Sequence, residues 1–250
     1  VNSPADARKA VRQRYKDGAD VIKITATGGV LSVAKNGQNP QFTADELAAI
    51  VSTAKDYGML TAAHAHGDEG MRRAIIAGIK TIEHGTLMEP STMDLMVKYD
   101  AYLVPTISAG KAAAANAATP GYFPEIIAKK ALEIGPRSQS TFAAAYKKGV
   151  KIAFGTDAGV SPHGDNAKEF GFMVAAGMPV MEAIAAATIT NANLLGYSNS
   201  LGQLKQGYTA DIVAVNEHPQ ANVSTLEQVV FVMKEGLIFK NQDKEVLRDY

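Results

Sequence analysis

Short apolar runs alternate with amphipathic segments over most of the chain. The runs occupy residues 19–25, 59–63, 79–83, 101–106 and 150–154. The first run carries apolar side chains on both faces, which is typical of a parallel strand in a sheet covered by helices. In the segments between the runs, apolar positions recur at helical spacing. The pattern therefore predicts an α/β fold in which parallel strands and helices alternate.

Two sequence signals mark where predicted helices begin. Ser3 followed by Pro4 is typical of an N-cap with proline in the first helical turn. Thr43 with Glu46 three residues later is the pattern of a capping box. The predicted helices cover approximately residues 3–18, 43–57, 68–77, 89–99, 125–148, 166–176 and 179–193.

Two segments between these elements are interpreted as loops. The glycine-rich residues 26–30 lack the spacing of the common phosphate-binding fingerprints. We interpret them as an active-site loop that uses the backbone freedom of glycine. The alanine-rich residues 108–120 are expected to form a mobile loop or lid.

The pattern changes after residue 196. An alternating strand is predicted over residues 210–215, and a hairpin is predicted from residues 229–235 and 237–240 around Glu235-Gly236. This segment contains no further β/α unit. We therefore predict two domains, a β/α part at residues 1–196 and a small β part at residues 197–250.

Histidines follow two neighbouring strands of the predicted sheet. His64 ends the run at 59–63 and His84 ends the run at 79–83, with a helix between them. The carboxyl ends of parallel strands meet at one edge of a sheet, where sites form. A single histidine there is more often a hydrogen-bonded core residue. Two at matching ends favour a metal site.

Two charged residues fall at other strand ends. Lys23 interrupts an apolar strand, and Asp157 follows residues 150–154 between glycines. A neutral lysine amine reacts with carbon dioxide to give a carbamate, an anionic ligand able to bridge two metals, but a salt-bridged strand-end lysine is an equal alternative. Asp157 has the position of a metal ligand and proton acceptor, although aspartate is also common in turns.

The amino-acid composition argues against some classes of binding partner and some kinds of site. The chain has 25 basic and 25 acidic residues and no basic block, so nucleic acid and anionic membranes are not expected as partners. It has no cysteine, which excludes disulfides, thiolate metal sites and a cysteine nucleophile. No segment has the pattern of a transmembrane span or a signal peptide.

Five motifs in order resemble the amidohydrolase superfamily, in particular its imidazolonepropionase-like and Xaa-Pro dipeptidase (prolidase) branch. The resemblance covers essentially the whole chain and implies a TIM-like β/α barrel with a two-metal centre, usually zinc, and a small β-sandwich. The motifs are Val21-Ile22-Lys23-Ile24, Ala63-His64-Ala65-His66-Gly67, Glu83-His84-Gly85-Thr86, Gly155-Thr156-Asp157-Ala158-Gly159 and the segment from Leu201 to Val213.

The resemblance also implies roles for individual residues. Lys23 corresponds to the carboxylated lysine that bridges the two metals, and His64 and His84 to two histidine ligands. Asp157 corresponds to the aspartate that binds metal and acts as the general base. The implied reaction is hydrolysis of the amide bond of a dipeptide or N-acyl amino acid by a metal-activated hydroxide. The resemblance gives His66 and His163 no clear assignment, and we expect both near the substrate. Together with Tyr102 they are candidates to bind its free carboxylate.

One departure from the family pattern limits this reading. Family members open their barrel with a first-strand His-x-His motif, whereas the only such motif here is His64-Ala65-His66, at the fifth-strand position. Five strands are predicted, and a closed barrel has eight. The sequence therefore reads as the C-terminal portion of a larger enzyme, with the later barrel strands and part of the sandwich.

Several functional alternatives remain open from the sequence. A cyclic-amide hydrolase of the imidazolonepropionase type is the main alternative within enzymes, and a non-catalytic metal-binding fragment is the other. A small-molecule substrate and a homo-oligomer are expected. A cytoplasmic location is favoured, although any signal peptide would lie in the preceding portion.

Overall fold

The computed structural model describes residues 1–242 and has a five-stranded parallel sheet as its centre. The strands lie in sequence order, and β1 pairs with β2 so that Lys23 is opposite Ala62 and Thr25 is opposite His64. The prediction of a β/α fold with five parallel strands is confirmed, as part of a TIM-like barrel. The strands are β1 (Val21–Thr25), β2 (Leu60–Ala65), β3 (Thr81–His84), β4 (Tyr102–Val104) and β5 (Lys151–Ile152).

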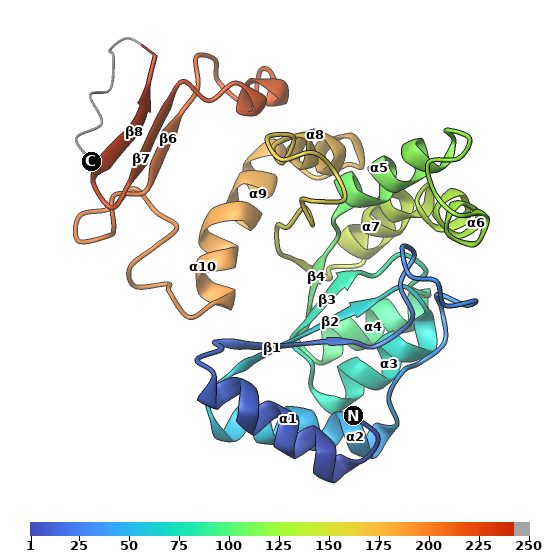
Figure 1. Cartoon of the computed structure of the whole chain (residues 1–250). Helices are drawn as coiled ribbons and strands as arrows, with labels where there is room; N and C mark the ends of the chain where they lie inside the picture. The colour runs from blue at the N-terminus through green and yellow to red at the C-terminus, as the bar shows by residue number, and fades with distance from the viewer. Residues whose placement is uncertain (243–250) are drawn as a thin grey trace.

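Helices follow the strands, and Figure 1 shows α1 to α4 together on one face of the sheet. Ile22 and Ile24 point toward that side and share one buried core with Ala7 and Val11 of α1 and Leu47 of α2. The helices of the β/α part are α1 (Pro4–Lys16), α2 (Ala44–Asp56), α3 (Asp68–Ala77), α4 (Pro90–Lys98), α5 (Ile107–Ala117), α6 (Glu125–Ile134), α7 (Arg137–Lys147), α8 (Lys168–Ala175), α9 (Val180–Ala185) and α10 (Asn191–Leu194), with a π-helical segment at Ala186–Thr190.

The two predicted N-terminal helix signals have the expected geometry. The Ser3 hydroxyl accepts a hydrogen bond from the amide of Asp6 at 3.1 Å. The amide of Thr43 donates to the Glu46 carboxylate at 2.9 Å. Both contacts satisfy backbone groups that a helix start leaves unpaired. They fix where α1 and α2 begin relative to the strands.

Two expectations about the segments between strands are wrong. Residues 108–120 are not a loop, because α5 occupies most of them and alanine is the strongest helix former. The single helix predicted at 125–148 is two helices, α6 and α7, separated at Gly135-Pro136. Proline has no amide hydrogen and cannot continue an α-helix from the preceding residue.

The small C-terminal sheet is antiparallel, as predicted, with the order β6-β7-β8. The strands are β6 (Ile212–Ala214), β7 (Phe231–Lys234) and β8 (Leu237–Asn241), and a 3-10 helix occupies Val223–Glu227. In the part of the chain that the structure describes, this sheet lies after residue 196. The domain boundary at residues 196/197 stays a prediction, and residues 243–250 of the second domain lie outside the described residues.

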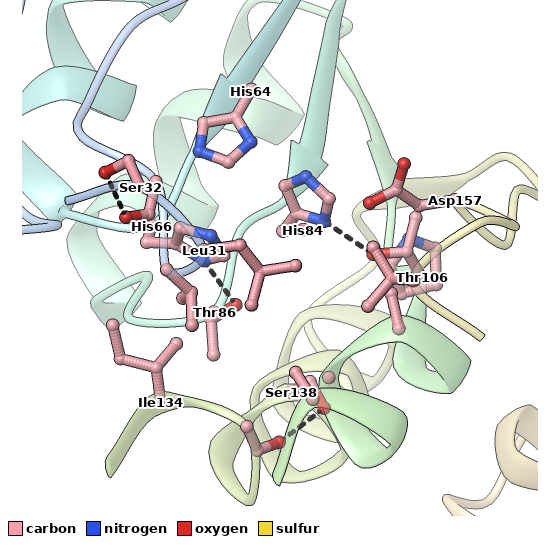
Figure 2. Close-up of a pocket in the computed structure, with 18 residues that line it drawn as sticks. Leu31, Ser32, His64, His66, His84, Thr86, Thr106, Ile134, Ser138 and Asp157 are labelled. Carbon is pink, nitrogen blue, oxygen red and sulfur yellow. Dashed lines mark hydrogen bonds between the residues drawn. The ribbon is translucent and has the colours of Figure 1, made fainter. Parts of the chain in front are cut away.

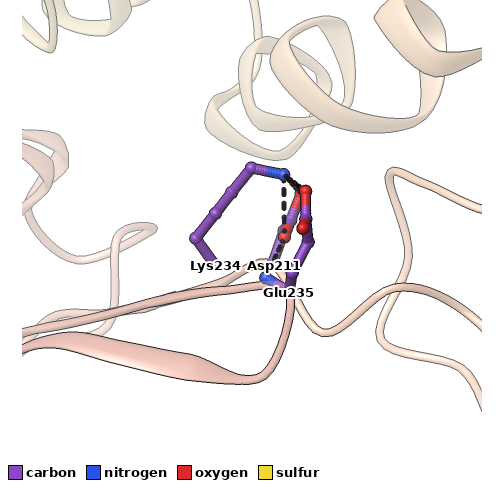
Figure 3. A network of polar contacts seen from close by, with 3 residues as sticks. All are labelled: Asp211, Lys234 and Glu235. Atoms are coloured by element: carbon purple, nitrogen blue, oxygen red, sulfur yellow. Dashed lines mark hydrogen bonds and ion pairs between the residues drawn. The ribbon is translucent and has the colours of Figure 1, made fainter. Parts of the chain in front are cut away.

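A polar network fixes the β7–β8 turn (Figure 3). Glu235 and Gly236 both have positive φ, 52° and 82°, as the two central residues of a type I′ hairpin turn require. Asp211 accepts a hydrogen bond from the Glu235 amide at 2.8 Å, and Lys234 Nζ lies 3.1 Å from the Asp211 carboxylate. The network joins the turn to the residue that precedes β6.

Candidate metal centre

Three histidines gather where β2 and β3 end. His64 lies in β2 and His66 two residues later, so strand alternation places both on the same face of the sheet. His84 ends β3. One ring nitrogen from each of the three lies within 4.8 Å of the others. The structure thus brings together the two predicted histidine ligands and adds His66, which the sequence analysis assigned to the substrate.

His84 reaches this group through an unusual backbone conformation. The strand register pairs Glu83 with His64, so regular alternation would turn His84 to the helix-covered face. His84 instead has φ 71°, in the left-handed region that non-glycine residues rarely occupy. The following Gly85 has φ 62°, and its amide donates to the Ala65 carbonyl at 3.0 Å. Such strain typically costs about 1–3 kcal/mol and is concentrated at functional sites.

Threonine hydroxyls hold two of the rings (Figure 2). His66 Nδ1 and Thr86 Oγ1 are hydrogen-bonded at 3.0 Å, and His84 Nδ1 and Thr106 Oγ1 at 2.6 Å. Each ring therefore has its other nitrogen left for a ligand. His64 Nε2 is buried and has no hydrogen-bond partner among the described residues. Buried polar atoms are rarely left in this state, and a metal-binding histidine is normally fixed through its second nitrogen.

The histidine rings are electrostatically suited to bind a cation. Burial lowers the pKa of His66 to about 3. Burial also lowers the pKa of His64, and it lowers the pKa of His84 well below its ordinary value, an effect that the neighbouring histidines reinforce. All three are then neutral at pH 7. A neutral imidazole has the free lone pair that a divalent metal requires, so the residues present fit such an ion.

Lys23 lies on the same side of the sheet as the histidines. Its neighbours Ile22 and Ile24 are buried against α1 and α2, so alternation directs Lys23 away from those helices. Its positive charge contributes to the lowered pKa of both His64 and His84. The position is compatible with the role predicted for Lys23.

Asp157 lies on the rim of the cavity that the histidines line. Like His84 it has a left-handed backbone, with φ 52°, and it lies in the segment that follows β5. Its negative charge raises the pKa of His64 and so opposes part of the effect of burial. Asp157 thus lines the cavity together with His64 and His84, whereas Lys23 does not line it, and neither Lys23 nor Asp157 belongs to the group of ring nitrogens within 4.8 Å. The roles of Lys23 and Asp157 as metal ligands stay a proposal.

The structure does not bring the other two predicted residues to this group. Tyr102 is the first residue of β4 and pairs with Thr81 and Lys151, near the amino ends of the strands. Its ring centroid lies 5.2 Å from Lys80 Nζ and 5.3 Å from Lys151 Nζ. His163 is exposed in the loop after Asp157 and does not line the cavity. The predicted run 101–106 already begins next to Tyr102, so its place at the amino end of the strand follows from the sequence and argues against a role at the carboxyl ends.

A cavity of about 200 Å³ lies beside the histidines. One wall comes from the loop after β1 and the other from α5 and α6, which the sequence analysis did not place there. Most of the wall is apolar. Its apolar side chains belong to Val30, Leu31, Pro105, Ala109, Ala113, Ile134 and Val160.

The loop after β1 is held over the cavity by a buried lysine on α6. Lys130 Nζ donates hydrogen bonds to the carbonyl oxygens of Gly29, Ser32 and Ala34, at 3.0, 2.6 and 2.9 Å. Gly28 fits in this loop because a Cβ there would lie 2.5 Å from a carbonyl oxygen. The loop therefore needs glycine for space, whereas the sequence analysis expected a need for backbone freedom.

Replacing Lys130 by methionine is expected to release this loop. Methionine keeps most of the apolar contact but leaves three carbonyl oxygens without a donor, so the free energy of unfolding should fall by about 1–3 kcal/mol. Limited proteolysis should cut the loop faster, and urea unfolding should give the stability. The neighbouring Lys129 is exposed on the same helix, so K129M is the matched control. Equal behaviour of the two variants would contradict this role.

The sequence matches a protein-family model and a curated relative over most of its length. A model of the amidohydrolase family matches residues 2–238. An ochratoxinase from Aspergillus niger is 35% identical over 240 residues, which are 94% of this chain and 49% of that protein. The chain therefore spans about half the length of the curated relatives it matches.

Two solved structures are similar over nearly the whole chain. A Xaa-Pro dipeptidase with bound methionine in its active site is 56% identical, with a TM-score of 0.95, over 96% of this chain and 59% of that one. A prolidase complexed with N-methylphosphonate-L-proline is 30% identical, with a TM-score of 0.90, over 97% of this chain and 60% of that one.

Among the helices that the structure describes, none has both the length and the apolar character needed to span a membrane.

Proposed function

Because the chain belongs to the amidohydrolase family, we propose that it forms the metal-binding part of a hydrolase that cleaves the amide bond of a dipeptide or N-acyl amino acid. The observation that carries this proposal is the group of three neutral histidines, one of which has a buried nitrogen with no hydrogen-bond partner within residues 1–242. The similar Xaa-Pro dipeptidase and prolidase support a dipeptide substrate.

His64, His66 and His84 would hold a divalent metal in this chain, with zinc as the ion of choice for three histidines. When bound, such an ion polarises a carbonyl group and lowers the pKa of water. The Lys23 amine would be carboxylated: its nitrogen forms a bond to the carbon of carbon dioxide and loses a proton to solvent, which leaves an anionic carbamate. That group would add oxygen ligands for a second metal.

Asp157 would move the proton in the proposed reaction. Its carboxylate is exposed at the rim of the cavity, where a water molecule and the substrate would both have access. It would accept a proton from the attacking water and deliver it to the nitrogen of the leaving amine. Hydrolysis then releases a free carboxylic acid and a free amine.

The wall of the cavity favours a substrate with an apolar side chain. Leu31, Ile134 and Val160 face the space beside the histidines, and burial of an apolar side chain there would remove it from water. The similar dipeptidase was solved with methionine in its active site. We therefore propose an apolar residue in the substrate of this protein.

The test combines zinc binding with hydrolysis. The chain alone should bind one zinc ion firmly and show little turnover of Xaa-Pro dipeptides. Joined to the part of the similar dipeptidase that it does not match, it should hydrolyse them, and D157N should lower kcat by about 100-fold or more. Turnover of a cyclic amide alone would favour the imidazolonepropionase-type alternative. Failure to bind zinc would contradict the proposal.

A further inference from the structure

A fully buried carboxylate lies at the beginning of α5, outside the group of predicted ligands. Glu169 belongs to α8 and has no exposed surface. Its carboxylate accepts hydrogen bonds from the amides of Ile107 and Ser108, at 2.8 and 2.7 Å, and from the Ser108 hydroxyl at 2.5 Å. All its described hydrogen bonds therefore lie at the first two residues of one helix.

These contacts replace the usual way of capping a helix. A threonine N-cap normally has an extended backbone and accepts hydrogen bonds from the first amides with its own hydroxyl. Thr106, the N-cap of α5, has φ 46° and makes no such bond. Its hydroxyl is hydrogen-bonded to His84 at 2.6 Å instead. Glu169 accepts hydrogen bonds from the amides that Thr106 leaves unpaired. A carboxylate at this position also interacts favourably with the positive end of the helix dipole.

Helix α8, which carries Glu169, is also linked to the segment that carries Asp157. Asn166, just before α8, donates a hydrogen bond from its side-chain amide to the Thr156 hydroxyl at 3.1 Å. The rings of Phe154 and Phe170 stack with centroids 4.3 Å apart. The helix that carries Glu169 is thus tied both to the end of β5 and, through α5, to His84 at the end of β3.

We propose that Glu169 is a positioning residue that caps α5, holds Thr106 in its left-handed conformation and so aims the ring of His84 into the metal centre. The contacts above support the order of dependence from Glu169 to Thr106 to His84. The inference deepens the proposed function and rests on it only where metal affinity is measured. Partners that orient metal-binding histidines typically change metal affinity by about 10–100-fold when removed.

The first experiment needs no metal. Nitrogen-15 NMR of the histidine rings in the chelator-treated chain reports which ring nitrogen carries the proton. We expect His84 to show one tautomer in the wild type and a mixture in E169Q and in T106V, whereas the exposed His218 gives the same signals throughout. Unchanged His84 signals in a folded E169Q variant would overturn the proposal.

The second experiment separates positioning from general stability. Met173 is fully buried in the same helix, so M173V lowers stability without touching the carboxylate contacts. Zinc affinity, measured by competition with a chelator, should fall about 10–100-fold in E169Q and less than about threefold in M173V. Equal losses in both variants would overturn the proposal, and no zinc binding by the wild type would contradict the proposed function instead.

A milder variant covers the case in which E169Q does not fold. S108A removes only the hydroxyl donor and keeps both amide hydrogen bonds to Glu169. It should change the same His84 signals by a smaller amount. Signals of His84 identical to those of the wild type in S108A would then overturn the proposal.

Discussion

Replacing His84 by asparagine is expected to weaken zinc binding by the chain more than 100-fold. His84 supplies one of the three ring nitrogens that lie within 4.8 Å of one another, so its loss removes a direct ligand and exceeds the 10–100-fold effect of an orienting partner. Asparagine is chosen because it tolerates the left-handed backbone that His84 adopts, with φ 71°. Titration with zinc against a chelator of known affinity measures the change.

The matched control for H84N is the same substitution at His163. This histidine is exposed and lies outside the cavity, so H163N should bind zinc as the wild type does. Circular dichroism of both variants checks that they are folded. Equal affinity of H84N and H163N would remove His84 from the metal centre.

Acid is expected to destabilise the metal-free chain through the same histidines. Burial holds the pKa of His66 at about 3, against 6.5 for an unperturbed histidine. Between these values the unfolded chain takes up a proton that the folded chain cannot accept. The contribution of His66 to the free energy of unfolding is therefore fully present above pH 6.5. It falls as the pH decreases, by about 1.4 kcal/mol per pH unit, which amounts to about 2 kcal/mol at pH 5.

Burial raises the pKa of Glu83 and of Glu169, so these carboxyl groups make the folded chain more stable as the pH decreases, opposite to His66. Comparison of the wild type with H66N separates the contribution of His66 from theirs. Urea unfolding at pH 7, 6 and 5 should give a steeper loss of stability for the wild type than for H66N. Replacing the exposed His218 should leave the wild-type slope unchanged. Parallel curves for the wild type and H66N would show that His66 is protonated in the folded chain.

The sheet was predictable because its strands carry a strong local signal. Each apolar run that ends near Lys23, His64, His84 or Asp157 became a strand in the predicted order. The small β sheet and its turn at Glu235-Gly236 were predictable for the same reason. In contrast, the helix boundaries around α5 and α6 depend on propensity and on Gly135-Pro136, which the spacing of apolar residues alone does not resolve.

Part of the site could also have been found from the sequence. Lys130 lies three residues after Ile127 and four before Ile134, within the buried stripe of α6, which marks it as a lysine that needs partners. Glu169 gives no such signal, because its hydrogen bonds go to a helix about sixty residues earlier in the chain. The direction of His84 follows from one backbone angle, which strand alternation predicts wrongly.

Zinc-edge X-ray absorption of the chain loaded with one equivalent of zinc tests the central claim most directly. The account predicts nitrogen neighbours at about 2.0–2.1 Å with the outer scattering typical of imidazole rings, and a reduced imidazole contribution in H84N but not in H163N. A spectrum with oxygen neighbours alone, identical in the wild type and H84N, would contradict a metal centre built from His64, His66 and His84.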